Sequence, residues 1–319
     1  MVYLVTGGTG FIGSYLVRDL LAEGNDVVTL QRSSATPLLK ELIPFEKMQH
    51  LVFIQGTIAD NGLLNETIKK YHPEIIVHFG WSMIPECDND ISLALQTNVI
   101  GTHNVFKAAL FFKLKRVVWS ASNTAINNLG KYFNNNLIDD SRGLYCPPNF
   151  YAATKALGEI MARQYTQNHD IDIITLRIPR VYGPGKNSGG GAAFTNLIKE
   201  FALNNPITIQ GGDSSQAYLY VEDSALVTLK ACNVSSTKNK LFNPHVGRNY
   251  NGWELAEILE EINPQAKITV LPGKIPYDMP ETDTSPCRIE LGFIPQYSLK
   301  DGIRKFANYF RKKNNLSLF

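Results

Sequence analysis

The chain has 319 residues, of which 44% are hydrophobic and 19% charged, and its formal net charge at pH 7 is +2. This length suffices for one large domain, or for a domain with a smaller lobe. The near-neutral charge gives no electrostatic case for nucleic acid binding, and no apolar run reaches membrane-spanning length. The N-terminal MVYLVTGGTG has no basic segment before a long apolar core, so we expect no signal peptide and a cytoplasmic protein.

Apolar runs of strand length alternate with helix-like stretches over the first 180 residues. The expected strands lie at 2–6, 26–30, 51–56, 74–80, 116–122 and 171–179. The expected helices between them include 11–24, 63–71, 93–112 and 151–165. Such alternation is typical of βαβ units. We therefore predict an α/β fold, with a Rossmann-like, doubly wound parallel sheet and helices on both of its faces.

After about residue 180 the pattern loosens, and we expect a smaller C-terminal α/β substrate lobe. A glycine-rich loop is followed by helices and strands at 194–204, 207–210, 251–262 and 267–271, and then by a terminal helix. We assign residues 1–178 to a dinucleotide-binding Rossmann domain, with returning segments near 216–246. Residues 179–319 then form mainly the substrate-binding lobe.

The sequence gives no sign of a metal site or of a disulfide framework. His78 follows the apolar run EIIV, where a strand-end residue is a simpler interpretation than a metal ligand. The cysteines lie far apart and form no metal-type pairs; they are Cys87, Cys146, Cys232 and Cys287. We expect reduced thiols in a cytoplasmic protein and no bound metal.

The segment VTGGTGFIG follows the first expected strand and opens the first helix. It satisfies Gly-x-Gly-x-x-Gly from Gly8, and equally Gly-x-x-Gly-x-x-Gly from Gly7. Glycines permit a tight turn that lets backbone N–H groups approach a pyrophosphate, and the helix N-terminus adds partial positive charge. The residues of this segment that we expect to contact a cofactor are Gly7, Gly10, Phe11, Ile12 and Gly13.

The second strand ends without the acidic residue that NAD-binding folds carry there, and an arginine follows. A carboxylate there would bind the adenosine ribose 2′-OH, but this chain has Gln31, which stands 18 residues past Gly13. Arg32 follows, and a guanidinium suits the 2′-phosphate of NADP through charge-assisted hydrogen bonds. We therefore predict NADP as the cofactor, with NAD as the alternative.

The stretch FYAATK places Tyr151 four residues before Lys155, so both side chains can share one helix face. A nearby ammonium favours the phenolate, because the positive charge stabilises the anion. A free tyrosine titrates near about 10, and proton exchange near neutral pH requires a pKa lower by roughly 2–3 units. An exposed lysine supplies only about 1 kcal/mol of this in water, so the pair is catalytic only in a sheltered site with another cation nearby.

Several segments together resemble the extended short-chain dehydrogenase/reductase family, and the resemblance covers nearly the whole chain. They follow the family's order and are TGGTGFIG, TNVIGTHNV, WSASNT, FYAATKALGE, LRIPRVYGPG, YLYVED and LGFIPQYSLKDGI. Members of this family mostly act on nucleotide-linked sugars, as epimerases, dehydratases, decarboxylases or ketoreductases. The resemblance therefore implies that the glycine-rich segment and the Tyr-x-x-x-Lys helix belong to one active site.

The resemblance also implies a role for each matching residue. Tyr151 would exchange a proton with the substrate, Lys155 would bind the nicotinamide ribose and lower the tyrosine pKa, and Ser122 would orient the reacting oxygen. The oxidised nicotinamide would be the additional cation. The other residues implied are Ile58, Asp60, Gly80, Asn98 and Pro179 for the cofactor, and Asn123 and Thr124 for the substrate.

Two departures from the family pattern concern the substrate. Members that bind nucleotide sugars carry an arginine for the diphosphate in the segment aligned with SSQAYLYVED, where this chain has Gln216. The sixth-strand signature usually has an asparagine where this chain has Arg180. Either the positive charge has moved to Arg180 and a diphosphate is still bound, or the substrate has no diphosphate. We predict that both residues contact the substrate.

The leading hypothesis is an NAD(P)-dependent 4-keto reductase or epimerase of a nucleotide-linked sugar. The alternative is a dehydrogenase of a non-nucleotide sugar, sugar acid or small alcohol. Apolar positions on more than one face of the helices near 91–112 and 150–166 indicate a homodimer through these helices, since a second apolar face requires a cover.

Overall fold

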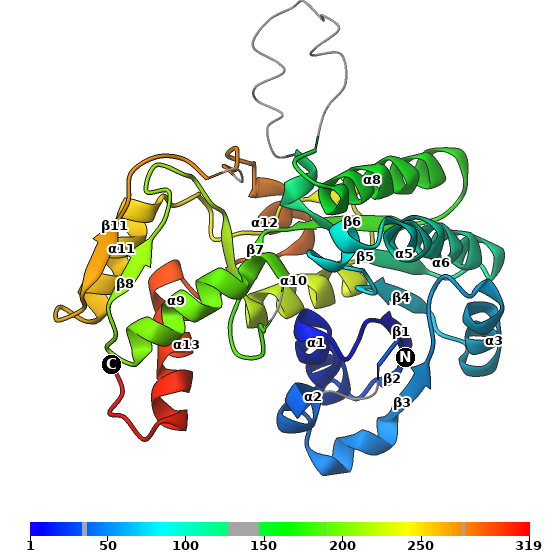
Figure 1. The fold of residues 1–319 in the computed structure, drawn as a ribbon. Helices are drawn as coiled ribbons and strands as arrows, with labels where there is room; N and C mark the ends of the chain where they lie inside the picture. The colour runs from blue at the N-terminus through cyan, green and yellow to red at the C-terminus, as the bar shows by residue number, and fades with distance from the viewer. Residues whose placement is uncertain (34–36, 127–146, 188, 276–277) are drawn as a thin grey trace, which may run out of the picture.

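The computed structural model describes the chain except for residues 34–36, 127–146, 188 and 276–277, so Cys146 lies outside the described residues. Seven parallel strands form the central sheet in the order β10-β6-β5-β4-β1-β2-β3 (Figure 1). Their bounds are β1 Val2–Thr6, β2 Asp26–Gln31, β3 Leu51–Gln55, β4 Ile75–His78, β5 Arg116–Ser122, β6 Ile173–Ile178 and β10 Leu241–Phe242. The predicted parallel sheet is confirmed, and the strand order reverses between β1 and β4, where such folds bind ligands.

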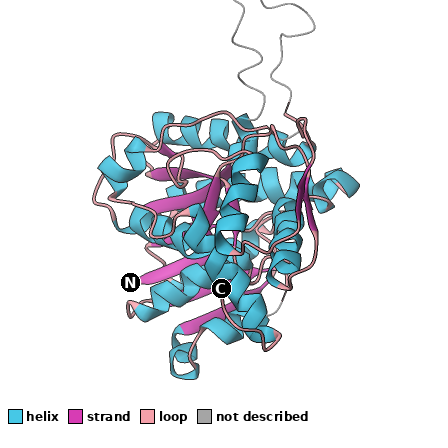
Figure 2. Cartoon of the chain, turned by 90° about the vertical axis from the view of Figure 1, so that its left-hand side faces the viewer, coloured by secondary structure: helices cyan, strands magenta, loops and turns pink. Residues whose placement is uncertain are grey.

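Helices cover both faces of the sheet, as the view along it shows (Figure 2). One face packs against α1 Phe11–Ala22, α2 Pro37–Leu42 and α10 Val221–Asn233. The other packs against α3 Asn61–Tyr71, α6 Gly101–Phe111 and α8 Phe150–Asn168. β4 and β5 are buried along their whole length, which agrees with the apolar runs IIV and VVW within them.

The helix predicted over 93–112 is interrupted. It consists of α5 Ile91–Ala94, a π-helical turn at Leu95–Ile100, and α6. A π turn holds one more residue than an α turn and often lies at a functional site. Here it turns the Asn98 side chain inward, where it binds the segment that follows β4.

The C-terminal part of the chain forms two small parallel pairs and a helical layer. β7 Arg180–Tyr182 pairs with β9 Tyr218–Tyr220, and β8 Ile207–Ile209 pairs with β11 Ile268–Val270. The sequence did not indicate β7, β9 or β10 as strands; they have two or three residues each. The remaining helices are α4 Glu86–Asn89, α9 Ala192–Ala202, α11 Gly252–Ile262, α12 Ser285–Leu291 and α13 Leu299–Lys313, with 3₁₀ turns at Phe45–His50, Asn123–Ile126 and Gly189–Gly191.

None of the helices in the described ranges combines the length and apolar character that a membrane crossing requires. The three described cysteines, Cys87, Cys232 and Cys287, are buried and form no disulfide. Within the described residues, no group of His, Cys, Asp and Glu side chains is arranged to hold a metal ion.

Candidate active site

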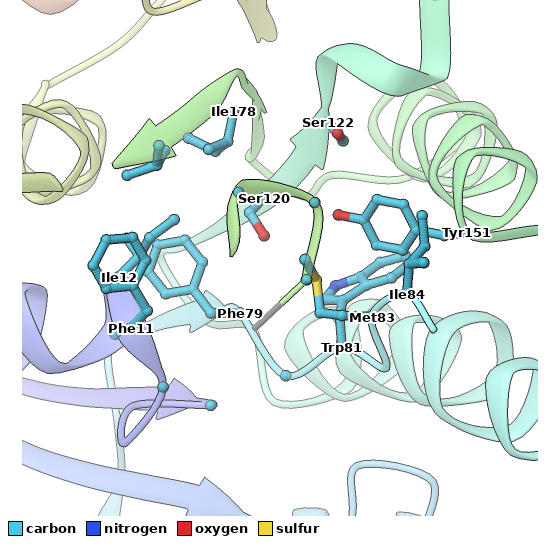
Figure 3. A pocket seen from close by; sticks show the side chains of 18 of the residues that line it. Phe11, Ile12, Phe79, Trp81, Met83, Ile84, Ser120, Ser122, Tyr151 and Ile178 are labelled. Atoms are coloured by element: carbon cyan, nitrogen blue, oxygen red, sulfur yellow. The ribbon is translucent and has the colours of Figure 1, made fainter. Parts of the chain in front are cut away.

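A cavity of about 810 Å³ opens at the carboxyl ends of the central strands (Figure 3). Its lining brings together nearly all of the site residues predicted from the sequence. These are Gly7, Gly10, Phe11, Ile12, Gly13, Arg32, Ile58, Gly80, Ser122, Asn123, Thr124, Tyr151, Lys155, Pro179, Arg180 and Gln216. Residues as far apart in sequence as the N-terminal glycines and Gln216 thus surround one space, whose volume is typical of a ligand site.

Two predicted cofactor residues lie outside this lining. The Asp60 carboxylate caps α3 by accepting a hydrogen bond from the Leu63 N–H at 3.0 Å. Asn98 is fully buried, and its side chain binds the backbone of Ser82 and the Thr154 hydroxyl. In this structure Asp60 holds the start of α3 and Asn98 holds the segment that follows β4, so both support elements around the cavity.

The glycine turn after β1 fits a pyrophosphate. Gly7 adopts φ 72°, and a Cβ there would lie 2.8 Å from the Phe79 backbone. A Cβ on Gly13 would collide with the Gly7 carbonyl oxygen, so only glycine lets α1 approach the turn this closely. α1 has Gly10 as N-cap, with no side-chain cap and no acidic residue in its first turn. Its first N–H groups therefore remain to bind a phosphate, as a dinucleotide requires.

Arg32 forms an ion pair at the edge of the cavity. Its guanidinium donates two hydrogen bonds to the Glu86 carboxylate, both at 2.9 Å. These hydrogen bonds raise the pKa of Arg32, and those from Arg32 and Ser82 lower the pKa of Glu86, so both groups are charged at neutral pH. The sequence did not indicate this partner, because Glu86 lies 54 residues further along the chain.

Ser122 and Tyr151 lie near one another on one side of the cavity (Figure 3). The Thr124 hydroxyl and N–H donate to Ser122 Oγ at 2.8 and 3.2 Å, which leaves the Ser122 proton for another acceptor. Burial raises the pKa of the Tyr151 phenol, and its hydrogen bond with Ser122 partly opposes this. The phenol is therefore protonated at neutral pH and is able to donate a proton.

Lys155 is buried beneath two indole rings. Its Nζ donates to the Ser120 carbonyl oxygen and lies 3.4 Å from the centre of the Trp81 ring and 5.7 Å from that of Tyr151. Burial holds the pKa of Lys155 well below its usual value. Trp81 stacks on Trp119 with ring centres 5.6 Å apart, so these indoles form the wall that shields the ammonium from water.

The cavity carries further positive charge along its lining. Arg180 lines it from β7, with its guanidinium carbon 5.8 Å from the centre of the Tyr218 ring. Lys186 lines it from the glycine-rich loop, with its Nζ 5.5 Å from the centre of the Phe11 ring, and burial lowers its pKa. Among the described lining residues there is no Asp or Glu, so this space favours an anionic ligand.

A comparison with protein families finds one whose sequence model matches most of the chain. The model of the NAD dependent epimerase/dehydratase family matches residues 3–244, which is most of the chain. The chain belongs to the NAD dependent epimerase/dehydratase family. This membership agrees with the resemblance inferred from the sequence motifs, and it makes the protein an enzyme of that family.

Relatives of this family member are similar along their whole length. A putative UDP-glucose 4-epimerase from Methanocaldococcus jannaschii is 27% identical, with 98% of this chain and 99% of the relative covered. A dTDP-glucose 4,6-dehydratase from Streptomyces niveus is 26% identical, with 98% and 93% covered. The structure of a UDP-glucose 4-epimerase from Thermus thermophilus in complex with NAD has a TM-score of 0.76 and 23% identity, covering 98% of this chain and 99% of that one. The structural similarity shows the shared fold.

Trp81 and Lys186 are among the cavity residues that the sequence reasoning missed. Trp81 directly follows Gly80, which was predicted to contact the cofactor, so its position was a usable signal. Lys186 lies in the glycine-rich segment, which the sequence indicated as a loop without a role in the site. Neither the Trp81–Lys155 contact nor the direction of the Lys186 side chain follows from the sequence.

Proposed function

We propose that the protein is an epimerase of a nucleotide-linked sugar that uses a nicotinamide dinucleotide. The observation that carries this proposal is the arrangement within one cavity. The glycine turn, the Ser-Tyr-Lys set and two further cations, Arg180 and Lys186, line the same space, with Lys186 beside Phe11. The cationic residues of the described lining are Arg32, Lys155, Arg180 and Lys186. A dinucleotide and a sugar linked to a diphosphate together supply the negative charge that this lining would match.

Ser122, Tyr151 and Lys155 would bind the reacting groups and transfer the proton. Tyr151 would hold the proton that moves to and from the reacting sugar oxygen at its Oη. Ser122 would donate its own proton to that oxygen and fix its position, since its Oγ already accepts from Thr124. Lys155 would anchor the ribose with the donors that Ser120 does not occupy. When bound, the nicotinamide supplies hydride transfer, which these side chains cannot perform.

An epimerase fits the lining better than a dehydratase does. Eliminating water from a sugar needs an acid and a base at adjacent carbons, and a pair of carboxyl groups is able to fill both roles. The residues beside Ser122 are Asn123 and Thr124, and the described lining contains no Asp or Glu. Epimerisation at a single carbon needs only the oxidation, rotation and re-reduction that the Ser-Tyr-Lys set would support.

Two other candidates each have an observation in their favour. A 4-keto reductase is favoured by Arg32, because a reductase exchanges its cofactor and commonly uses NADPH. A dehydrogenase of a non-nucleotide sugar, sugar acid or small alcohol is favoured by Gln216, which lines the cavity where the related enzymes carry a diphosphate-binding arginine. Arg32 alone suits NADP, whereas the matching family is NAD dependent, and both cofactors are compatible with the proposed epimerase.

Incubation with UDP-glucose, UDP-galactose and a 4-keto sugar nucleotide distinguishes these candidates. Product isomers without net change in the near-ultraviolet absorbance of reduced nicotinamide are expected for the epimerase. Stoichiometric consumption of NAD(P)H would identify the reductase. No turnover, together with no thermal protection by any nucleoside diphosphate, would favour the non-nucleotide alternative and contradict the proposal.

We also propose a homodimer through α5, the π turn and α8. Apolar side chains on these elements remain exposed to solvent, with 51% of Ile91, 44% of Leu95, 44% of Ile100 and 58% of Ile160 accessible. Their burial against a second copy would remove this apolar surface from water.

A further inference from the structure

The end of β2 has no acidic residue of its own, yet a carboxylate lies there. In dinucleotide-binding folds an acidic residue at this place binds the adenosine ribose 2′-OH, whereas a nearby arginine suits a 2′-phosphate. Glu86 reaches this place from α4 and occupies both outer nitrogens of the Arg32 guanidinium. The arginine that suggested NADP is therefore already paired with a negative charge.

Glu86 is held in place by hydrogen bonds that lead into the core. The Ser82 hydroxyl donates to Glu86 Oε2 at 2.5 Å. The Ser82 N–H donates to Asn98 Oδ1 at 2.8 Å, and Asn98 Nδ2 donates to the Ser82 carbonyl oxygen at 3.1 Å. Ser82 and Asn98 are both fully buried. The ion pair itself is exposed to solvent, with 46% of the Arg32 side chain and 41% of the Glu86 side chain accessible, but Glu86 is held by a buried residue and not by Arg32 alone.

The ion pair also lies on the adenosine side of the cavity. β1 pairs with β2 on one side and with β4 on the other, and the glycine turn follows it. Arg32 follows β2, Glu86 follows β4, and the contact between them spans the end of β1 that carries the pyrophosphate turn. Gln31 lines the cavity beside this contact, and its Oε1 has no hydrogen-bond partner among the described residues.

We propose that Glu86 determines the cofactor specificity of this enzyme and selects NAD against NADP. A 2′-phosphate would have to displace Glu86 from Arg32 and would then lie beside its negative charge. A ribose 2′-hydroxyl is neutral, and it is able to donate a hydrogen bond to Glu86 or to Gln31. The inference rests on the proposed function in one respect, since it requires that the cavity binds a nicotinamide dinucleotide.

Binding titrations of NADH and NADPH without substrate test this inference. Quenching of tryptophan fluorescence reports binding, because Trp81 lines the cavity. The variants are Glu86→Gln, Arg32→Ala and the double variant. The matched control is Asp88→Asn, which removes the same charge from an exposed residue of the same helix.

The wild-type protein is expected to bind NADH at least about tenfold more tightly than NADPH. Glu86→Gln should free Arg32 to bind the 2′-phosphate, and NADPH affinity should rise about tenfold, as expected for one added charge-assisted hydrogen bond. The affinity for NADH should change much less. The double variant should lose this gain, and Asp88→Asn should keep the wild-type ratio.

An unchanged NADPH-to-NADH ratio in Glu86→Gln would overturn the inference while leaving the proposed function intact. A wild-type preference for NADPH would do the same. Absence of binding by either dinucleotide would overturn the proposed function together with the inference. The two failures are therefore distinguishable in one set of titrations.

Discussion

The surroundings of Tyr151 raise its pKa, whereas the proton transfer proposed for it requires a lower one. Burial raises the pKa of its phenol, and the ammonium of Lys155 is directed away from it, toward the Ser120 carbonyl oxygen. The chain by itself therefore keeps the phenol protonated, and the activation that the sequence assigned to Lys155 is not achieved by these two residues alone. The charge of an oxidised nicotinamide, if bound beside the phenol, would lower this pKa.

Tyr151→Phe is expected to abolish turnover while leaving dinucleotide affinity nearly unchanged. The ring is retained, so the packing around it is preserved, but the transferable proton is lost. General acid–base catalysis contributes about 10²–10⁴-fold, and steady-state kinetics should show a loss of at least that size. Turnover like that of the wild type would exclude Tyr151 as the proton donor.

Arg180→Ala is expected to raise the Michaelis constant for the sugar substrate by about 10–100-fold, as for loss of a hydrogen-bonded charge pair. Among the residues that the structure describes, the contact recorded for its guanidinium is with Tyr218, and no carboxylate forms an ion pair with it. Dinucleotide affinity should be unaffected. A lower melting temperature with an unchanged Michaelis constant would instead assign Arg180 to the support of β7 and β9.

At the scale of elements, β4 and the π turn are joined through His78. The Thr102 hydroxyl donates to the Asn98 carbonyl oxygen, so it accepts from His78 Nε2 at 3.0 Å. Thr6 Oγ1 then donates to His78 Nδ1 at 2.7 Å. Burial, helped by the charge of Lys155, lowers the pKa of His78 to about 3. The neutral imidazole thus holds the end of β4 at the cavity.

This arrangement predicts a loss of stability in mild acid. The pKa of His78 is lower in the folded than in the unfolded chain, so its contribution is complete above the unfolded pKa of about 6.5 and declines as pH falls toward 3. The loss should approach roughly 1.4 kcal/mol for each pH unit. Urea unfolding between pH 7 and pH 4 should show a smaller decline for His78→Gln, which keeps a donor and an acceptor. Equal declines would contradict this account.

The sequence predicted those elements whose patterns are local. The alternation of apolar strands and helices predicted β1 to β6, and the glycine spacing predicted the turn that precedes α1. Short strands such as β7 and β9 escaped prediction, because only Pro179 separates β7 from β6 and β9 runs directly into α10. The Glu86 partner of Arg32 escaped because it lies 54 residues further along the chain, so the sequence indicated the cation but not the carboxylate that pairs with it.

At the scale of the whole molecule, the proposed dimer is the simplest cover for the apolar side chains on α5, the π turn and α8. Ile160→Arg places a charge at the centre of this surface and should convert a dimer to monomers in sedimentation experiments. Ile289→Arg is the matched control, because Ile289 is 77% exposed on α12 and lies outside the proposed interface. A monomeric wild-type protein would exclude this assembly.

β10 belongs to the central sheet but is translated more than 60 residues after β6, so the sheet cannot be completed until late in synthesis. β10 pairs with β6 at the sheet edge, and the preceding α10 packs on α1. Arg116 on β5, which is 2% exposed, donates to the carbonyl oxygens of Ala231 and Val234 at the end of α10. A nascent chain of 1–178 would therefore lack α10 on the face that α1 and α2 cover, and the Arg116 guanidinium would be without those acceptors. We expect ribosome-bound chains to become protease-resistant only after residue 242 has emerged, since the N-terminal half depends on residues translated after the start of the lobe.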